Sequence, residues 1–326
     1  MKNKKCLFRG FPLIICMCML ICGLGGCQTE ELVITNETGT SIGNIAMGRG
    51  CFAYQNGLLY FSDISNIYEY DMESGKTVFF PINKPGDPND LHVTQNHIVY
   101  SGFTEEYNRC AMAITKDGKT TITAFVPSAG CYCLYLNEKE AYYLSGKGGD
   151  LFHRNMETGD ETMLLQKVQS YSFTSSHLYV TQSTDEKFVL KARVHGEDDF
   201  HAIPLTFEPV QVLASDNALF LQKTQPYQIV RYCDGEETPL PIYSIKYQFL
   251  DDQLIYADEK AYKDSTWTVK SYHLNTATEQ VLCEEVFEFG VFEEGFAVFW
   301  CRTDMGSVWK LFDFENNELK QIYPSA

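Results

Sequence analysis

The sequence predicts an all-β protein, a β-propeller of seven four-stranded antiparallel blades, with six or eight blades as the alternatives. Two markers, an apolar triplet and a turn that often contains glycine, recur about every 40 residues and predict the repeat. Short apolar segments between turn residues predict the strands within each repeat. No helical periodicity longer than three turns interrupts this pattern. The chain has 326 residues, 44% of them apolar and 14% aromatic, which is ample material for a folded core.

Residues 51–80 show one copy of the repeating unit. An apolar tetrad is followed by the turn Gln55-Asn56-Gly57 and a second strand, then by a polar break, a third strand, a glycine turn and a fourth strand. Glycine and asparagine tolerate the left-handed backbone conformation that a tight hairpin needs. The unit is therefore a four-stranded meander.

The second strand recurs as an apolar triplet along the chain. These triplets occupy residues 59–61, 98–100, 141–143, 178–180, 219–221, 254–256 and 297–299, and their last members lie 39, 43, 37, 41, 35 and 43 residues apart. The turn before the fourth strand recurs in phase, at residues 73–75, 116–118, 157–159, 195–196, 234–235, 275–277 and 315–317, and five of these seven turns contain glycine. Because a short meander cannot bury its faces alone, the units must stack.

Three prolines indicate which strand of the unit lies at an edge. Pro204, Pro239 and Pro241 fall in predicted fourth strands, where a missing backbone N–H is tolerated only at the outer edge of a sheet. The first strand of each unit is therefore expected to line a central channel.

Residues 1–26 have the charge order of a secretory signal peptide. Lys2, Lys4, Lys5 and Arg9 precede an apolar run over residues 11–24, which ends in small residues. A membrane-spanning helix is the alternative, but it needs about 20 apolar residues, and this run is shorter and is broken by Pro12 and glycine pairs.

The end of that segment, Leu24-Gly25-Gly26-Cys27, resembles the lipobox of bacterial lipoproteins. The resemblance implies cleavage before Cys27 and a thioether from Cys27 to a diacylglycerol, so that membrane lipid is a partner and the protein faces the extracellular side of a Gram-positive cell membrane. Two acyl chains are a stable anchor. The alternative is an ordinary secreted protein.

We expect residues 27–46 to form a lipidated tether, with a strand at 31–35 that adds to the last blade, and residues 47–326 to form one propeller domain.

The exported part is strongly acidic. Without residues 1–26 it keeps 22 Lys and Arg against 43 Asp and Glu, a formal net charge of −21, which argues against nucleic acid as a partner. Seven of the 12 cysteines lie beyond Cys27, an odd number, so at least one is unpaired. We interpret them as small buried apolar residues of strands.

Residues 60–63, Tyr-Phe-Ser-Asp, and residues 66–68, Asn-Ile-Tyr, resemble the repeat of the YWTD propellers of the low-density-lipoprotein-receptor type, and residues 254–258 are a weaker copy. The chain after Cys27 also resembles uncharacterised propeller lipoproteins of Gram-positive anaerobes. The YWTD resemblance implies six blades, against the seven counted here, and binding through a propeller face in place of a reaction.

The loops predict which face would bind. Tight turns collect on one face, and longer loops with aromatic residues collect on the other, where the candidate binding residues are Phe103, Tyr107, Arg109, Tyr227 and Tyr262. The tight-turn face is acidic, which indicates either a site for a basic partner or cations, or simply solvated turns.

No residues form a recognisable catalytic or metal motif. The seven histidines are scattered, without an HxH or HExxH pair, and no GxSxG elbow, P-loop or dinucleotide fingerprint occurs, so we predict no metal and no cofactor and nominate no catalytic residue. Residues 263–267, KDSTW, faintly resemble the aspartate box of sialidase propellers, but the spacing differs and we interpret the match as coincidence. The predicted function is non-catalytic binding of a protein, peptide or carbohydrate. The alternatives are a glycan hydrolase or lyase with its site in the central pocket, and a structural lipoprotein.

Overall fold

The computed structural model describes residues 50–63, 65–82, 88–104, 106–128, 130–137, 139–146, 148–185, 187–263, 265–303 and 306–324. In these ranges the chain forms antiparallel β-strands joined by turns. The described residues contain no helix that is long and apolar enough to cross a membrane. The predicted signal peptide, the lipobox with Cys27, the tether and the strand at 31–35 lie outside the described residues.

Twenty of the strands form five four-stranded sheets, each in chain order. The sheets are β1 (Phe52–Gln55), β2 (Leu58–Ser62), β3 (Asn66–Asp71) and β4 (Thr77–Pro81); β5 (Asn89–Val93), β6 (His97–Phe103), β7 (Arg109–Thr115) and β8 (Thr121–Phe125); β9 (Tyr132–Leu136), β10 (Glu140–Leu144), β11 (Leu151–Asn155) and β12 (Glu161–Leu165); β13 (Val168–Phe173), β14 (His177–Ser183), β15 (Phe188–Val194) and β16 (His201–Ile203); β17 (Pro209–Ser215), β18 (Ala218–Lys223), β19 (Gln228–Cys233) and β20 (Glu236–Tyr243).

The remaining strands form one seven-stranded sheet. Its strands are β21 (Tyr247–Leu250), β22 (Gln253–Lys263), β23 (Thr266–His273), β24 (Thr278–Phe292), β25 (Phe296–Thr303), β26 (Gly306–Asp313) and β27 (Glu318–Tyr323). The long strand β24 pairs with β23 through its first part, residues 278–286, and with β25 through its second part, residues 286–292. One strand thus ends one meander and begins the next.

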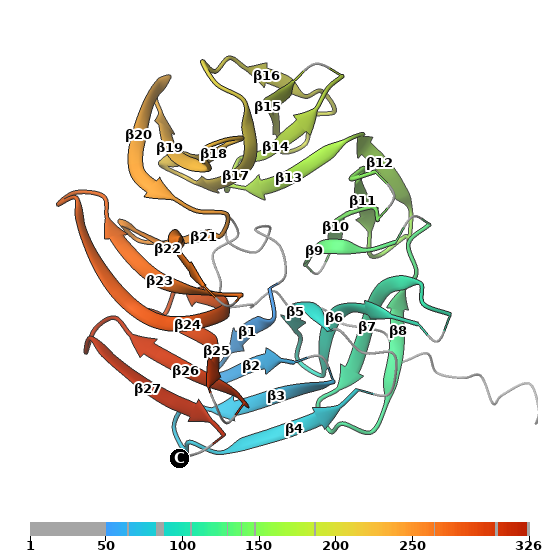
Figure 1. Ribbon diagram of the computed structural model, residues 1–326. Helices are drawn as coiled ribbons and strands as arrows, with labels where there is room; N and C mark the ends of the chain where they lie inside the picture. The colour runs from blue at the N-terminus through green and yellow to red at the C-terminus, as the bar shows by residue number, and fades with distance from the viewer. Residues whose placement is uncertain are drawn as a thin grey trace, which may run out of the picture. The chain divides into compact units, whose positions relative to one another are not determined.

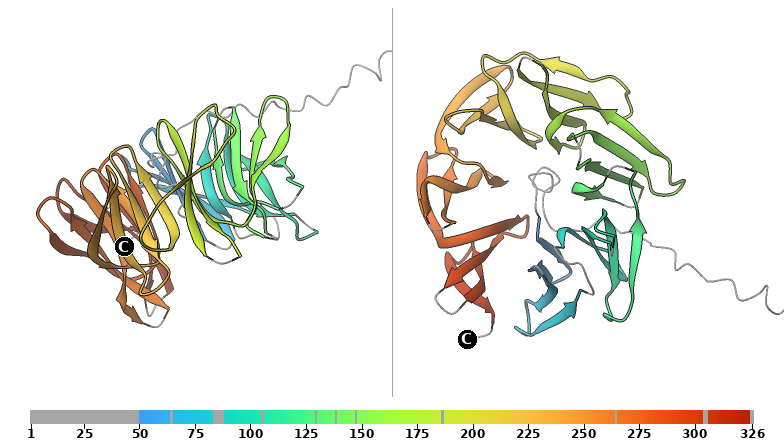
Figure 2. Two further views of the ribbon diagram at one scale, coloured as in Figure 1. Left: turned by 90° about the horizontal axis from the view of Figure 1, so that it is seen from above. Right: turned by 45° about the vertical axis from the view of Figure 1, so that its right-hand side comes forward.

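Figures 1 and 2 show the sheets set around a common axis, with β1, β5, β9, β13, β17 and β21 toward the centre and β4, β8, β12, β16 and β20 toward the outside. The all-β prediction and the four-stranded antiparallel unit are confirmed. Every predicted triplet lies in a second strand of its meander, namely β2, β6, β10, β14, β18, β22 or β25. Pro239 and Pro241 lie in the edge strand β20, as expected, whereas Pro204 directly follows β16.

A backbone hydrogen bond joins the two tight turns of the repeating unit. The amide at the start of the second turn donates to a carbonyl of the first turn: Met72 to Gly57, Lys116 to Asn96, Met156 to Lys139, His195 to Ser176, Leu274 to Asp252 and Phe314 to Gly295, at 2.8–3.0 Å. In the β17–β20 sheet the Cys233 thiol donates instead to the carbonyl of Asn217, at 3.3 Å. These acceptors have the same spacing as the apolar triplets, so both sequence markers report one contact between the turns.

Side chains of the inner strands satisfy backbone groups of the next sheet. An inner strand pairs on one side only, and its other edge carries N–H groups that need acceptors once they are buried. The Oγ atoms of Ser170 and Ser172 on β13 accept from the amides of Val212 and Ala214 on β17, both at 2.9 Å. Within the seven-stranded sheet, the side-chain oxygen of Gln248 on β21 likewise accepts from the amide of β24 at position 291, at 2.7 Å. Hydrogen bonds as well as apolar contacts therefore link successive inner strands.

His92 makes such a link between β5 and β9. Its Nε2 lies 2.9 Å from the carbonyl oxygen of Leu134, and its side chain is buried. Burial lowers the pKa of His92 from its ordinary 6.5 to about 4, so the ring is neutral at pH 7 and Nε2 donates.

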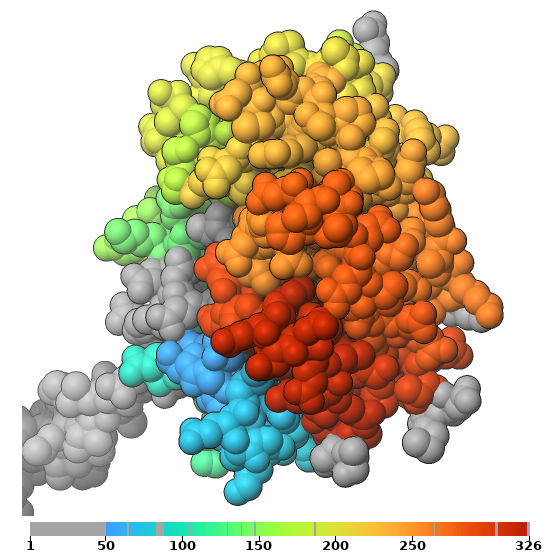
Figure 3. Space-filling view, turned by 90° about the vertical axis from the view of Figure 1, so that its left-hand side faces the viewer, coloured from blue at the N-terminus to red at the C-terminus, as the bar shows by residue number. Residues whose placement is uncertain are grey.

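The first and last sheets meet through an apolar cluster. Leu59, Phe61 and Tyr68 of the first sheet pack with Val298 and Trp309 of the last. The rings of Phe61 and Trp309 have centroids 5.2 Å apart. Among the described residues no strand is shared between these two sheets, which lie side by side as the blue and red segments of Figure 3. Side-chain packing therefore closes the described ring.

Phe52 is the innermost part of this closure. A Cβ atom on Gly290 of β24 would lie 2.9 Å from Cδ2 of Phe52, so only glycine allows the ring to approach β24 this closely. Replacing Phe52 by alanine should lower the free energy of unfolding by about 3 kcal/mol, because it leaves a cavity between the first and last sheets. Chemical denaturation measures the change.

Phe79→Ala is the matched control, because Phe79 lies on the edge strand β4 and is 61% exposed. Its effect should stay within about 0.5 kcal/mol. Equal losses in the two variants would show that the closure does not depend on Phe52.

The buried neutral state of His92 makes stability depend on pH. The unfolded chain binds a proton at His92 below about pH 6.5, and the folded protein does so only near pH 4, so stability is present above this window and is lost as pH falls through it. Between pH 7.5 and pH 5 the natural protein should lose about 2 kcal/mol more than His92→Gln, as measured by urea denaturation at each pH. The other histidines are common to both proteins, so parallel pH profiles would contradict this role.

Candidate functional site

A pocket of about 930 Å³ opens on the long-loop face, between the β22–β23 hairpin, β24 and the β25–β26 hairpin. Charged and hydroxyl side chains surround one indole in its wall. The lining residues are Ala261, Lys263, Ser265, Thr266, Trp267, Thr268, Glu284, Glu285, Arg302 and Thr303.

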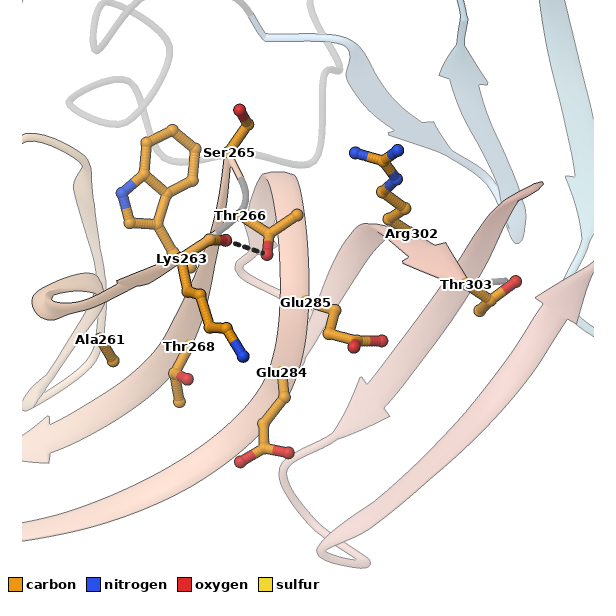
Figure 4. Close-up of a pocket in the computed structure, with 10 residues that line it drawn as sticks. Ala261, Lys263, Ser265, Thr266, Thr268, Glu284, Glu285, Arg302 and Thr303 are labelled. Atoms are coloured by element: carbon orange, nitrogen blue, oxygen red, sulfur yellow. Dashed lines mark hydrogen bonds between the residues drawn. The ribbon is translucent and has the colours of Figure 1, made fainter. Parts of the chain in front are cut away.

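A β-bulge in β24 places the two carboxylates of the pocket. Trp267 pairs with Val286 and Val269 pairs with Cys283, so two residues of β24, Glu284 and Glu285, stand opposite one residue of β23. Glu285 has a φ of 59°, in the left-handed region that residues other than glycine rarely adopt. The bulge removes both side chains from the regular ladder, and Figure 4 shows them leaving the same strand.

Two hairpins supply the basic side chains. Lys263 pairs with Thr266 across the β22–β23 turn, where the Thr266 hydroxyl donates to the Lys263 carbonyl at 2.8 Å. Arg302 precedes Thr303 at the end of β25, and the Thr303 hydroxyl donates to the carbonyl of Gly306 at 2.9 Å. These bonds fix the turns, and Figure 4 shows Lys263 on one side of the two glutamates and Arg302 on the other.

The charged side chains of the pocket form no ion pairs with one another in the described part of the chain. Lys263, Glu284, Glu285 and Arg302 are all exposed, and no ion pair joins any two of them there. Charges that remain solvated and unpaired can bind a ligand of opposite charge without first breaking an internal bond. The pocket therefore offers two acidic and two basic groups to a ligand.

Trp267 gives the pocket a rigid aromatic wall. Its ring packs against Tyr262, with centroids 5.3 Å apart, and the Lys246 Nζ lies 5.3 Å from the Trp267 ring centroid. Lys246 also pairs with Glu288, so the cation that supports the indole is itself held by a carboxylate. An indole supported in this way is typical of a residue that carries much of the binding energy of an interface.

The structure brings two of the five predicted binding residues together and places a third beside the pocket. The Arg109 guanidinium lies between two rings, 5.0 Å from the centroid of Phe103 and 4.7 Å from that of Tyr132. It also donates to the Ser101 hydroxyl at 3.4 Å, and Ser101 donates to the buried Asp90 at 2.7 Å. Arg109 is thus engaged between the second and third sheets and is not free for a ligand.

The remaining three predicted residues differ in exposure. Tyr262 is 52% exposed and contacts Trp267 at the pocket wall. Tyr107 is 76% exposed, and Tyr227 is half-buried. Within the described residues neither Tyr107 nor Tyr227 makes a ring contact with the other three predicted residues.

Burial changes the role of Asp90. Desolvation raises its pKa, and the Ser101 hydrogen bond and the Arg109 charge oppose that rise. Its φ of 52° lies in the left-handed region, which is unusual for a strand residue. Asp90 is therefore a structural link between strands.

Sequence reasoning missed most of the pocket. Lys263 and Arg302 lie in loops that were expected to be long, but loop length does not distinguish them from other surface charges. Trp267 ends the KDSTW stretch, residues 263–267, whose resemblance to the aspartate box we interpret as coincidence, and no sequence signal marks this half-buried indole as a pocket residue. No sequence pattern marks Glu284 and Glu285 as pocket residues, because a bulge depends on the pairing register of two strands.

The acidic tight-turn face carries a second pocket, of about 550 Å³, between the β17–β20 sheet and the start of the seven-stranded sheet. Several of its carboxylates already have partners: Asp216 accepts from the Ser175 amide at 3.0 Å, and Asp252 lies 3.1 Å from Nε2 of His273. No group of three or more His, Cys, Asp or Glu side chains in the described ranges is placed to hold a metal ion. The long-loop pocket is the stronger candidate.

Comparisons with known proteins show the fold. No family model matches the chain, and no curated protein matches it in sequence. The propeller domain of the Trilobed protease from Pyrococcus furiosus, described as having an open velcro topology, is 10% identical with a TM-score of 0.57, over 85% of this chain and 96% of that domain. A puromycin-hydrolysing peptidase from Mycobacterium tuberculosis is 8% identical with a TM-score of 0.61, over 89% of this chain and 56% of the peptidase.

A third similar structure is TolB from Acinetobacter baumannii, 11% identical with a TM-score of 0.50, over 82% of this chain and 77% of TolB. The chain spans only 54–56% of the length of two peptidases and a puromycin hydrolase among its structural neighbours. At such identities the likeness concerns the fold, which is that of propeller proteins.

Proposed function

We propose that this protein is a non-catalytic binding module of the cell envelope and that the long-loop pocket holds a peptide segment carrying charges of both signs. One observation carries the proposal: two acidic and two basic side chains, without ion pairs among them in the described ranges, surround the indole of Trp267. A peptide offers side chains of both signs and apolar groups that fit such a wall.

Charge favours a peptide over a neutral glycan as the ligand. Covering Lys263, Glu284, Glu285 and Arg302 with an uncharged ligand would desolvate four charges without a partner, which costs free energy. A peptide with complementary charges offsets that cost. An indole wall alone would suit either ligand.

The inner strands favour binding over hydrolysis in the central channel. In β1, β5, β9, β13, β17, β21 and residues 286–292 of β24, the carboxylates are Asp90 and Glu288. Asp90 accepts a hydrogen bond from Ser101, and Glu288 forms an ion pair with Lys246. A glycosidase needs two carboxylates free to act on the scissile bond. The described residues offer none in that position.

We also propose that the ring has seven blades. The seven-stranded sheet then counts as two blades that share β24, and the recurring contact between the two turns, which occurs seven times in the described ranges, supports this count. For the envelope location the support is the lipobox at residues 24–27 and the signal-like segment before it.

Binding can be tested with the full chain in detergent against a peptide library and a glycan array. We expect peptides with both acidic and basic residues to bind, and Trp267→Ala and Arg302→Ala each to weaken binding at least about 10-fold, because each removes a contact at the pocket wall. Phe79→Ala, an exposed aromatic outside the pocket, should bind as the natural protein does. Binding to glycans alone, or variants that bind unchanged, would contradict the proposed ligand or the proposed site.

Lipidation can be tested separately. Cys27→Ser should move the protein from the membrane to the soluble fraction, because it removes the thiol that would carry the diacylglycerol, and the N-terminal peptide should lose the corresponding mass. Cys22→Ser, five residues earlier in the predicted signal peptide, should stay lipidated. A natural protein whose N-terminal peptide is unprocessed and carries no lipid mass at Cys27 would contradict lipidation and favour the membrane-spanning alternative.

A further inference from the structure

Two buried cysteines lie in contact beneath the pocket. The Sγ atoms of Cys283 on β24 and Cys301 on β25 are 3.4 Å apart, and both side chains are buried in the same apolar cluster. A disulfide has an S–S length of about 2.05 Å, so the sulfurs need to approach by about 1.4 Å. Rotation of the two side chains within adjacent strands supplies a movement of this size.

Each thiol is the chain neighbour of a pocket residue. Cys283 directly precedes Glu284 in the bulge, and Cys301 directly precedes Arg302 at the end of β25. Strand pairing between β24 and β25 begins only at position 286 of β24, and its register shifts between positions 286 and 288. A covalent link between the two cysteines would fix an acidic and a basic residue of the pocket relative to each other.

We propose that Cys283 and Cys301 form an intramolecular disulfide that ties β24 to β25 under the pocket. The bond joins residues 18 positions apart and stabilises the fold by restricting the unfolded chain. It does not depend on what the pocket binds.

The reaction is a thiol–disulfide exchange with a small disulfide donor such as oxidised glutathione. The Cys283 thiolate attacks one sulfur of the donor and releases the first thiol, and the Cys301 thiolate then attacks the mixed disulfide and releases the second. The two protein thiols are oxidised, the donor is reduced to two thiols, and the two protein protons end on those thiols.

Burial sets the time at which exchange occurs. A donor cannot reach sulfurs that are buried in the folded protein, so the bond forms while β24 and β25 are still pairing. Other cysteines have different neighbours: the Cys110 thiol lies 3.3 Å from Sδ of Met112, and Cys233 donates to a turn carbonyl. One bond between Cys283 and Cys301 leaves an odd number of thiols beyond Cys27, as the count requires.

The test is refolding of the full chain from denaturant in oxidised and reduced glutathione, followed by alkylation under denaturing conditions and mass spectrometry. We expect two fewer alkylated thiols after oxidation and a cross-linked peptide pair that contains Cys283 and Cys301. Cys283→Ser and Cys301→Ser should each lose the cross-link, and Cys110→Ser, which replaces another buried cysteine, should keep it.

The serine variants are first compared with reduced natural protein by melting temperature, which shows whether they fold. A fully alkylated Cys283 and Cys301 after oxidative refolding, or a cross-link that joins Cys283 to a different cysteine, would overturn the proposal. Either result leaves the peptide-binding measurement unaffected, so the two proposals fail separately.

Discussion

A four-stranded meander has two apolar faces and can bury them only against other sheets. In this protein each sheet is too small to form a core of its own, and the apolar clusters lie between sheets or at the join of one meander to the next. The cluster of Tyr135, Tyr142, Tyr171 and Phe173, for example, combines side chains of the β9–β12 and β13–β16 sheets. The fold therefore depends on mutual burial around the ring.

Hydrogen bonds of the inner strands set the relative position of neighbouring sheets. Apolar contacts alone do not set how far one sheet is displaced along its neighbour. The serine hydroxyl oxygens of β13 and the side-chain oxygen of Gln248 on β21 accept hydrogen bonds from specific backbone N–H groups of the next inner strand. Because an unpaired buried N–H costs free energy, these bonds select one register between neighbouring sheets.

The repeat could be predicted from sequence because each unit carries its own local signals. The triplets such as 59–61 report a buried second strand, and the glycine turns report a backbone conformation that few residues adopt. Neither signal reports how a sheet pairs at its ends, so the continuous strand β24 was not foreseen. The same limit applies to the site: Arg109 looked like a loop residue, but Phe103 and Tyr132 enclose it, and that contact joins residues from three strands.

The central claim is that the sheets stabilise one another around the ring, including where the first sheet meets the last. Native-state hydrogen exchange, read by mass spectrometry on peptides from β1–β4 and β25–β27, tests this most directly. The account predicts that the slowest amides of both segments exchange with the same free energy of opening, because neither sheet remains folded without the other. Slow amides in β25–β27 that stay protected while all of β1–β4 opens at a lower free energy would contradict it.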